Sequence, residues 1–152
     1  MPEKATLERA RKAKREGKSP TTQAGEFVRE EIHHVREGKH GARSAKQAIA
    51  IGLSKARRAG VNLPPPEKGE ANEKTRKSAA LAYKAGKNMP NKRVSPKRSR
   101  AVKGALKREG RSAASTPALA KQARTAAKKR GAASRSAAAR KAASTRSRKR
   151  AA

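Results

Sequence analysis

Residues 112–152 set the strictest limit on the fold, because they contain almost nothing that can build a core. They hold 16 Ala, 12 Lys or Arg and 9 Ser or Thr, with no acidic and no aromatic residue. Alanine buries little apolar area, so such a segment cannot offset the entropy lost when it orders. We therefore expect residues 91–152 to form a low-complexity cationic tail that is largely disordered when free.

Charge divides the chain into two different kinds of polymer. Residues 1–74 carry 17 basic and 10 acidic side chains, whereas residues 75–152 carry 25 basic side chains and a single acid, Glu109. The whole chain has a net charge of +31 and only one Phe, one Tyr and no Trp. In the first half, where acids lie among the cations, the charges are as consistent with a solvated surface as with a binding surface. The unbalanced charge of the second half predicts a polyanionic partner.

The first half carries the start and stop signals of short helices. Ser19-Pro20 suits a helix start, Ser44 with Gln47 forms a capping box, and glycines follow the apolar-periodic stretches. These signals predict helices at about 3–16, 20–37, 45–59 and 73–85, the last one stopped by Gly86.

Apolar stripes on two of these helices predict a helical hairpin. The residues on helix 20–37 are Ala24, Phe27, Val28, Ile32 and Val35. Those on helix 45–59 are Ala45, Ala48, Ile49, Leu53 and Ala56, with Gly52 allowing close approach. We expect Phe27, Val28, Ile32 and Val35 to pack against Ile49, Leu53 and Val61. So small a core is only marginally stable, and self-association or the binding of a partner would stabilise it further.

The predicted fold class is therefore all-α, with the chain divided by composition. Residues 1–63 form a small helical module, 64–72 a proline-rich linker, 73–90 a short helix and 91–152 the tail. Within the tail, Ser95-Pro96 and Thr116-Pro117 begin two similar segments that end on glycine. These segments, about 96–109 and 117–130, are helix-competent and are expected to fold against a polyanion.

Two stretches resemble known families. The motif KQAIAIGLSKARRAG (46–60) resembles that of a family of small basic bacterial proteins of unknown function, over roughly residues 20–66. That resemblance implies a bacterial origin and a short helical module, and it brings no catalytic residue. The tail resembles those of linker histones and of Ala- and Lys-rich histone-like bacterial proteins. SPKR (95–98) is similar to the S-P-K-K/R turn that such tails use against the DNA minor groove.

Residues that could support catalysis or bind a metal are scarce. There is no cysteine, so a thiolate site is excluded. His33 and His34 occupy adjacent helix positions that diverge by about 100°, so they and His40 do not predict a metal cluster. Glu30-Glu31 predicts a solvated face. We expect no enzyme activity, no metal, no cofactor and no small-molecule substrate.

These observations predict sequence-independent binding and compaction of duplex DNA by a cytoplasmic, nucleoid-associated protein. Scarce aromatic residues disfavour stacking on single strands, and the seven-residue connection 38–44 disfavours a helix-turn-helix. An RNA-binding or ribosome-associated protein is one alternative. An adaptor whose residues 20–61 bind a protein partner, or a second copy of the chain, is another. The absence of a long apolar run predicts no membrane association.

The residues expected to contact nucleic acid are the cations of the tail and the Ser-Pro turn. They are Ser95, Pro96, Lys97, Arg98, Arg100, Lys103, Lys107, Arg108, Arg111, Lys121, Arg124, Lys128, Lys129, Arg130, Arg140, Lys141, Arg148, Lys149 and Arg150. The side of helix 45–59 predicted to be exposed adds a secondary contact, formed by Lys46, Lys55, Arg57 and Arg58.

Overall fold

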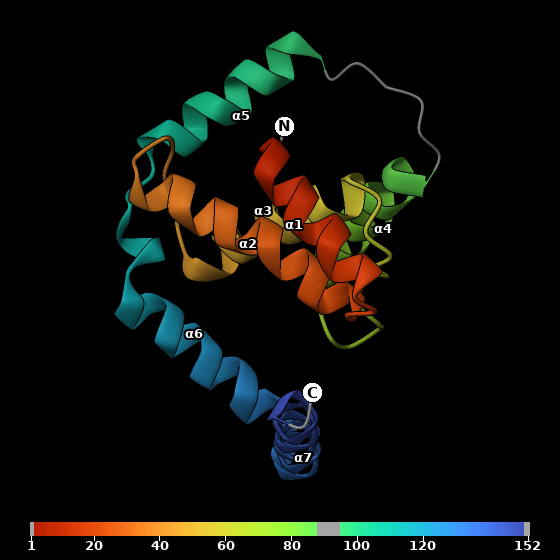
Figure 1. The fold of residues 1–152 in the computed structure, drawn as a ribbon. Coiled ribbons are helices and arrows are strands. Elements are labelled where there is room, and N and C mark those ends of the chain that lie inside the picture. Colours follow the sequence, from red (N-terminus) through yellow and green to blue (C-terminus); the bar gives the residue numbers. More distant parts are fainter. Residues whose placement is uncertain (1, 88–94, 151–152) are drawn as a thin grey trace. The chain divides into compact units, whose positions relative to one another are not determined.

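The computed structural model describes residues 2–87 and 95–150, apart from the side chain of Lys149 (Figure 1). Apart from one isolated bridge, Lys68 to Ala71, the described residues form no strand, which confirms the all-α class. The elements are α1 (Lys4–Arg15), α2 (Pro20–Arg36), α3 (Ala45–Arg58), α4 (Glu73–Lys87), α5 (Pro96–Arg108), the 3-10 helix η1 (Ser112–Ala114), α6 (Thr116–Lys129) and α7 (Gly131–Arg150).

The chain divides into two compact units. The first spans Met1–Ser115 and the second Thr116–Ala152. The composition places the start of the tail at residue 91, which lies within the first of these units.

Local capping explains where α2 and α3 begin. The Ser19 hydroxyl accepts a hydrogen bond from the Thr22 N–H, and Pro20 occupies the first helical position. The Ser44 hydroxyl accepts from the Gln47 N–H at 3.2 Å. Gln47 Oε1 in turn accepts from the N–H of Arg43, one residue earlier than in the usual capping box.

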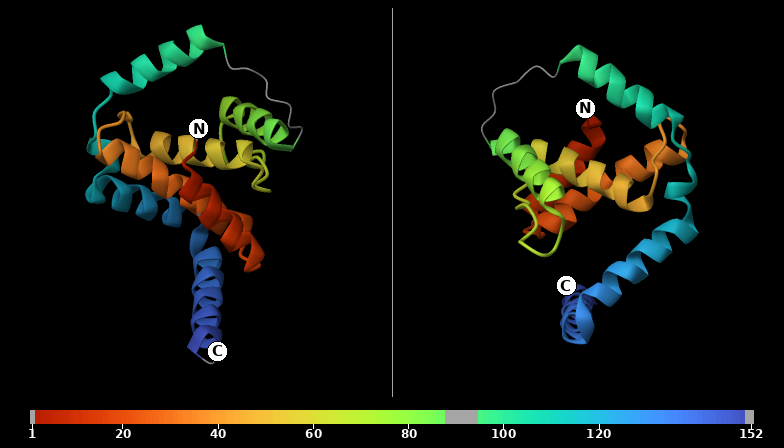
Figure 2. Two further views of the ribbon diagram at one scale, coloured as in Figure 1. Left: turned by 45° about the horizontal axis from the view of Figure 1, so that its top comes forward. Right: turned by 180° about the vertical axis from the view of Figure 1, so that it is seen from behind.

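α2 and α3 form the predicted hairpin, and α1 and α4 pack on its two helices (Figure 2). Phe27 and Val35 of α2 are almost fully buried, whereas Val28 and Ile49 are half-buried. A Cβ atom on Gly52 would lie 2.6 Å from the Cα of Val28, which confirms that this glycine permits the close approach of α2 and α3.

α4 continues past Gly86, so the prediction that this glycine stops the helix is wrong. A Cβ atom at Gly86 would collide with the carbonyl oxygen of Arg57 in α3. Gly86 is therefore a contact point between two helices rather than a helix end.

Two alanines of the predicted tail belong to the core of the first unit. Ala113 and Ala114 of η1 are buried in a cluster with Val35, Ala42 and Ala48. The Arg36 Nε donates to the Ala114 carbonyl at 2.9 Å. Backbone hydrogen bonds from Gly41 to Leu106 and from Ala42 to Gly110 hold the preceding chain in place. The core of the first unit thus includes residues as far along the chain as Ala114.

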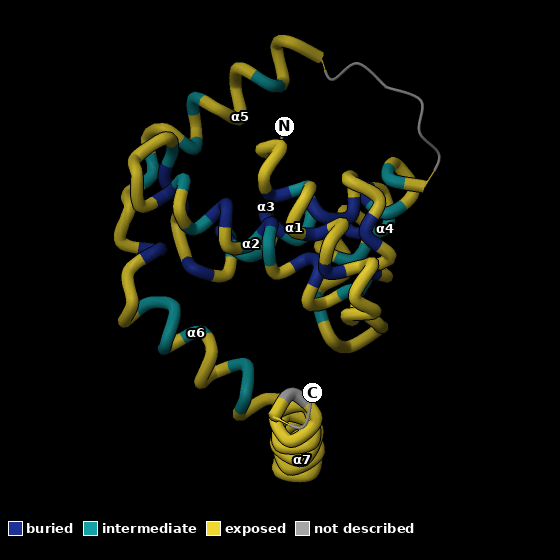
Figure 3. Tube along the Cα trace, in the orientation of Figure 1, coloured by how far each residue is buried: buried dark blue, intermediate teal, exposed yellow. Residues whose placement is uncertain are grey.

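Apart from η1, the helices beyond residue 95 have no buried residue among those that the structure describes (Figure 3). α5 and α6 confirm the two helix-competent segments. α7 was not predicted to be helical, and all its described side chains are exposed. Disorder of these residues in the free chain stays a prediction.

Candidate nucleic-acid interface

The second unit presents an exposed set of cations with no acidic neighbour in sequence. Residues 116–152 contain 12 Lys or Arg and no acidic residue. The described members are all exposed: Lys121, Arg124, Lys128, Lys129, Arg130, Arg135, Arg140, Lys141, Arg146, Arg148 and Arg150. Arg135 and Arg146 are cations of this helix surface that the sequence-based set omitted.

The cations of α7 point around the whole helix rather than to one side. At 100° per residue, Arg135, Arg140 and Lys141 lie about 100–140° apart around the axis. A helix of 20 residues is about 30 Å long and here carries seven cations. It has no apolar face with which to pack against another element, so its surface is suited to a solvated or polyanionic environment.

In the first unit, α5 carries the remaining tail cations. Pro96 is at the first helical position and the Ser99 N–H bonds the Ser95 carbonyl at 2.9 Å, so SPKR begins a helix rather than forming a separate turn. Arg100, Lys103 and Lys107 follow at helical spacing on one face. The described cations here are exposed: Lys97, Arg98, Arg100, Lys103, Lys107, Arg108 and Arg111. The residues predicted to contact nucleic acid are therefore divided between the two units: those up to Arg111 belong to the first and those from Lys121 onward belong to the second.

The four residues of the predicted secondary contact on α3 are not all exposed as expected, and their contact with nucleic acid stays a prediction. Lys46 and Arg58 are exposed, but Arg57 is buried and donates to the carbonyls of Leu63 and Pro64 at 3.1 and 3.2 Å. Burial lowers the pKa of Arg57. The Arg57 guanidinium thus fixes the segment after α3 to the module and is unavailable to a phosphate.

Lys55 is likewise committed inside the protein. Its Nζ lies 2.6 Å from Oε2 of Glu31 and 3.5 Å from Oε1 of Glu30. Both glutamates are buried, with 4% of Glu30 and none of Glu31 exposed, so the predicted solvated face is also wrong. Buried carboxylates need a counter-charge, and Lys55 supplies it from the facing helix.

A second acidic–basic group joins the start of α1 to the end of α2. Oε1 of Glu3 lies 2.9 Å from Nε2 of His34 and 3.2 Å from Nζ of Lys39. The hydrogen bond with His34, followed by that with Lys39, lowers the pKa of the Glu3 carboxyl. The carboxylates of Glu37 and Glu3 raise the pKa of Lys39. These groups pair with one another and so add little to a phosphate-binding surface.

Comparison with known proteins gives one match. Residues 11–68 match the model of a "Family of unknown function (DUF6496)". The match covers the last five residues of α1 with all of α2 and α3, and it ends before α4. It agrees with the expected family of unknown function. Neither the curated proteins nor the solved structures gave a match.

Across residues 2–87 and 95–150, no helix combines the length and apolar character needed to cross a membrane.

Proposed function

We propose that this chain binds nucleic acid through charge, without reading sequence, and that it compacts duplex DNA. The observation that carries the proposal is α7, an exposed helix with cations on all sides and no acidic residue beyond Glu109 in the sequence. Such a helix repels itself in isolation, and a polyanion removes that repulsion.

The distribution of charge around α7 favours compaction over simple coating. A helix with cations on one side neutralises one phosphate backbone, whereas cations on opposite sides contact two. Duplex DNA carries one negative charge per about 1.7 Å of axis, so several contacts are available along the roughly 30 Å length of α7. α5 offers a further cationic face, and bridging by several segments draws duplexes together.

Duplexes are favoured over single strands because the chain has only two large aromatic rings, one buried and one already in contact with a lysine. Phe27 is buried in the core of the first unit. The hydroxyl of Tyr83 donates to Asn62, and Nζ of Lys87 lies 4.6 Å from the centre of its ring. Single-strand binding usually relies on exposed aromatic platforms. RNA-binding or ribosome association, with A-form duplexes as ligand, remains the second candidate on the same charge pattern.

The test is a salt-titrated competition between duplex DNA, duplex RNA and single strands of equal length. We expect a preference for duplex DNA and a steep fall in affinity with salt, with a slope near −0.9 for each phosphate neutralised. A variant with the Arg and Lys residues of α7 changed to Gln should lose affinity and flatten the slope. The matched control changes the same Arg residues to Lys, which keeps the charge and should keep the affinity.

Light scattering on long duplex DNA tests compaction separately. The full chain should condense the DNA at protein concentrations where the Gln variant does not. A preference for duplex RNA would favour the second candidate. Equal binding by the Gln variant and the parent chain would show that α7 is not the binding element.

A further inference from the structure

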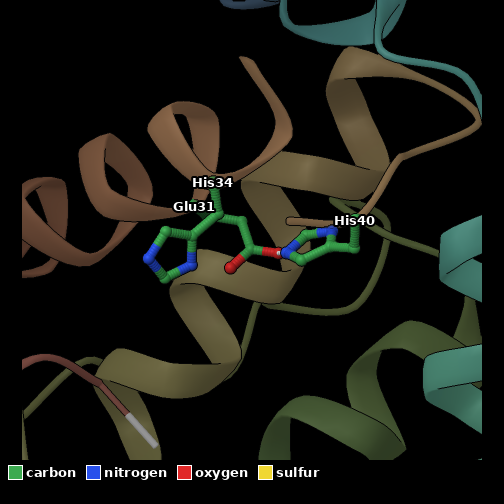
Figure 4. A group of neighbouring side chains, drawn as sticks. All are labelled: Glu31, His34 and His40. Carbon is green, nitrogen blue, oxygen red and sulfur yellow. Dashed lines mark ion pairs between the residues drawn. The ribbon is translucent and has the colours of Figure 1, made fainter. Parts of the chain in front are cut away.

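Three side chains that could bind a metal ion converge at the end of α2. Glu31 and His34 are one helical turn apart on the same face of α2, and His40 follows in the loop (Figure 4). Gly38, with φ of +75°, turns the chain back so that His40 faces the helix it has just left. One ligand atom from each residue lies within 4.8 Å of the other two.

We propose that Glu31, His34 and His40 bind a divalent transition-metal ion of the zinc class. His33 and His34 do diverge, as adjacent helix positions must, but the third ligand is supplied by Glu31. Two imidazoles and one carboxylate are a donor set typical of Zn²⁺ sites that keep a fourth position for water. The hard ions Mg²⁺ and Ca²⁺ prefer oxygen ligands alone.

The spacing of the first two ligand atoms already fits such an ion. Nε2 of His40 lies 3.2 Å from Oε1 of Glu31. Two ligands at about 2.0–2.1 Å from a tetrahedral zinc ion are separated by about 3.3 Å. The ligand atom of His34 lies within 4.8 Å of the other two, so all three residues can reach one ion.

The second nitrogen of each imidazole is held by an outer partner. Nε2 of His34 is 2.9 Å from the Glu3 carboxylate, which leaves Nδ1 on the side of the ring that faces Glu31 (Figure 4). Nδ1 of His40 is 3.0 Å from the carbonyl oxygen of Gly41, which leaves Nε2 for the ion. A carboxylate or carbonyl on the second nitrogen is the usual support of a metal-binding histidine.

Glu31 is positioned in the same way. Nζ of Lys55 approaches Oε2, so Oε1 is the oxygen nearest to His40. Within the described residues, neither oxygen receives a hydrogen bond of good geometry although the side chain is fully buried. Lys55 neutralises the carboxylate from the side of Oε2, but a buried carboxylate without an aligned hydrogen-bond donor is costly, and a cation at Oε1 would supply the missing partner. The two histidine side chains keep 13% and 18% of their surface exposed, which gives an ion a route in.

The competing explanation is an ion-pair network that needs no metal, in which His40 and Lys55 pair with Glu31. The two explanations differ in what they require of Nδ1 of His34. The network makes no use of that nitrogen, whereas the metal site makes it a ligand. Loss of His34 should therefore abolish metal binding, whereas the ion pair between His40 and Glu31 should survive its loss.

The experiment is a zinc titration of the full-length chain against a chromophoric chelator, with Co²⁺ as a spectroscopic substitute. We expect one equivalent of Zn²⁺ to bind and to raise the melting temperature, and Co²⁺ to give the absorption of a four-coordinate site with nitrogen ligands. His34→Gln and His40→Gln should each lose the site. Glu3→Gln, which removes the carboxylate beside His34 together with its ion pair to Lys39, should weaken it by roughly 10- to 100-fold.

The matched control is His33→Gln, because His33 is exposed, adjacent to His34 and outside the cluster. It should bind Zn²⁺ as the parent chain does. Equal loss in His33→Gln and His40→Gln, or no stoichiometric binding by the parent chain, would overturn the proposal. Should either ligand variant fail to fold, the Co²⁺ spectrum of the parent chain still tests the proposal. A spectrum typical of six oxygen ligands would contradict the proposed site.

Discussion

α2 and α7 are both regular helices, yet different forces hold them. α2 has a capping serine, an N-terminal proline and two nearly fully buried large side chains, Phe27 and Val35. α7 contains more alanine than α2, but none of its described side chains is buried. The comparison shows that alanine stabilises packing only where larger side chains surround it. In α7 alanine supplies helix propensity alone, and the state of that helix depends on what neutralises its charge.

The largest effect should come from removing the second unit. A chain ending at Ser115 loses 12 cations and no core residue. We expect its affinity for duplex DNA at low salt to fall by roughly 100-fold or more, because each lost phosphate contact removes about 0.9 from the salt slope. The melting temperature of the remainder should not change. Tight binding retained by this chain would assign the interface to the first unit.

A chain ending at residue 90 is the informative companion to that truncation. It also lacks Ala113 and Ala114, which complete the cluster around Val35. We therefore expect a lower melting temperature than for the chain ending at Ser115, measured by circular dichroism. Equal melting temperatures would mean that η1 adds nothing to the core.

Phe27→Ala should destabilise the first unit by about 3–5 kcal/mol, because it removes the largest fully buried apolar side chain of the described core. In so small a module this is enough to unfold it, whereas DNA binding by the second unit should persist. Urea titration measures the loss. Leu81→Ala is the control, since Leu81 is 69% exposed and should change stability by less than about 0.5 kcal/mol.

The same substitution at two glycines should act in opposite directions. Gly52→Ala places a Cβ 2.6 Å from the Val28 backbone and should cost about 1–3 kcal/mol by forcing α2 and α3 apart. Gly25→Ala, in α2, meets nothing within 4 Å and should stabilise by up to about 1 kcal/mol through helix propensity. Equal effects in urea titration would show that the two helices are not in close contact at Gly52.

The smallest free-energy change concerns α7 itself. A peptide of residues 131–150 should show little helix in water at low salt, because short isolated helices are marginal and seven like charges repel. Duplex DNA or polyphosphate should raise its helix content, as read from circular dichroism. A peptide that is fully helical without a polyanion would remove the distinction between α2 and α7.

Much of the first unit could be predicted because its signals are local. Ser44, Gln47 and the apolar spacing of α2 and α3 lie within a few residues of the structure that they specify. The burial of Ala114 could not be predicted, since its partner Arg36 is 78 residues away and alanine carries no pattern in an Ala-rich segment. Periodicity also could not reveal that Glu31 is neutralised by Lys55 on another helix.

The candidate interface was predictable only in its composition. A run of Lys and Arg without acids identifies the cations of α5, α6 and α7, because no fold is needed to see a net charge. Burial of Arg57 depends on the path of the chain at Leu63 and Pro64. No capping residue or apolar spacing near Arg57 predicts that path. The cluster of Glu31, His34 and His40 had a readable part, the one-turn spacing of Glu31 and His34, but the return of the loop at Gly38 was needed to complete it.

The burial of η1 gives the chain a bivalent arrangement. Because Ala113 and Ala114 are fixed in the core, α5 and α6 are cationic arms attached on either side of one anchored point. If the chain binds duplex DNA as proposed, a duplex captured by one arm would meet the other at an effective concentration set by the few residues between them, which for short connections is in the millimolar range. On the proposed function, avidity of this kind would make weak individual contacts sufficient, and it would let the protein move along DNA by releasing one arm at a time.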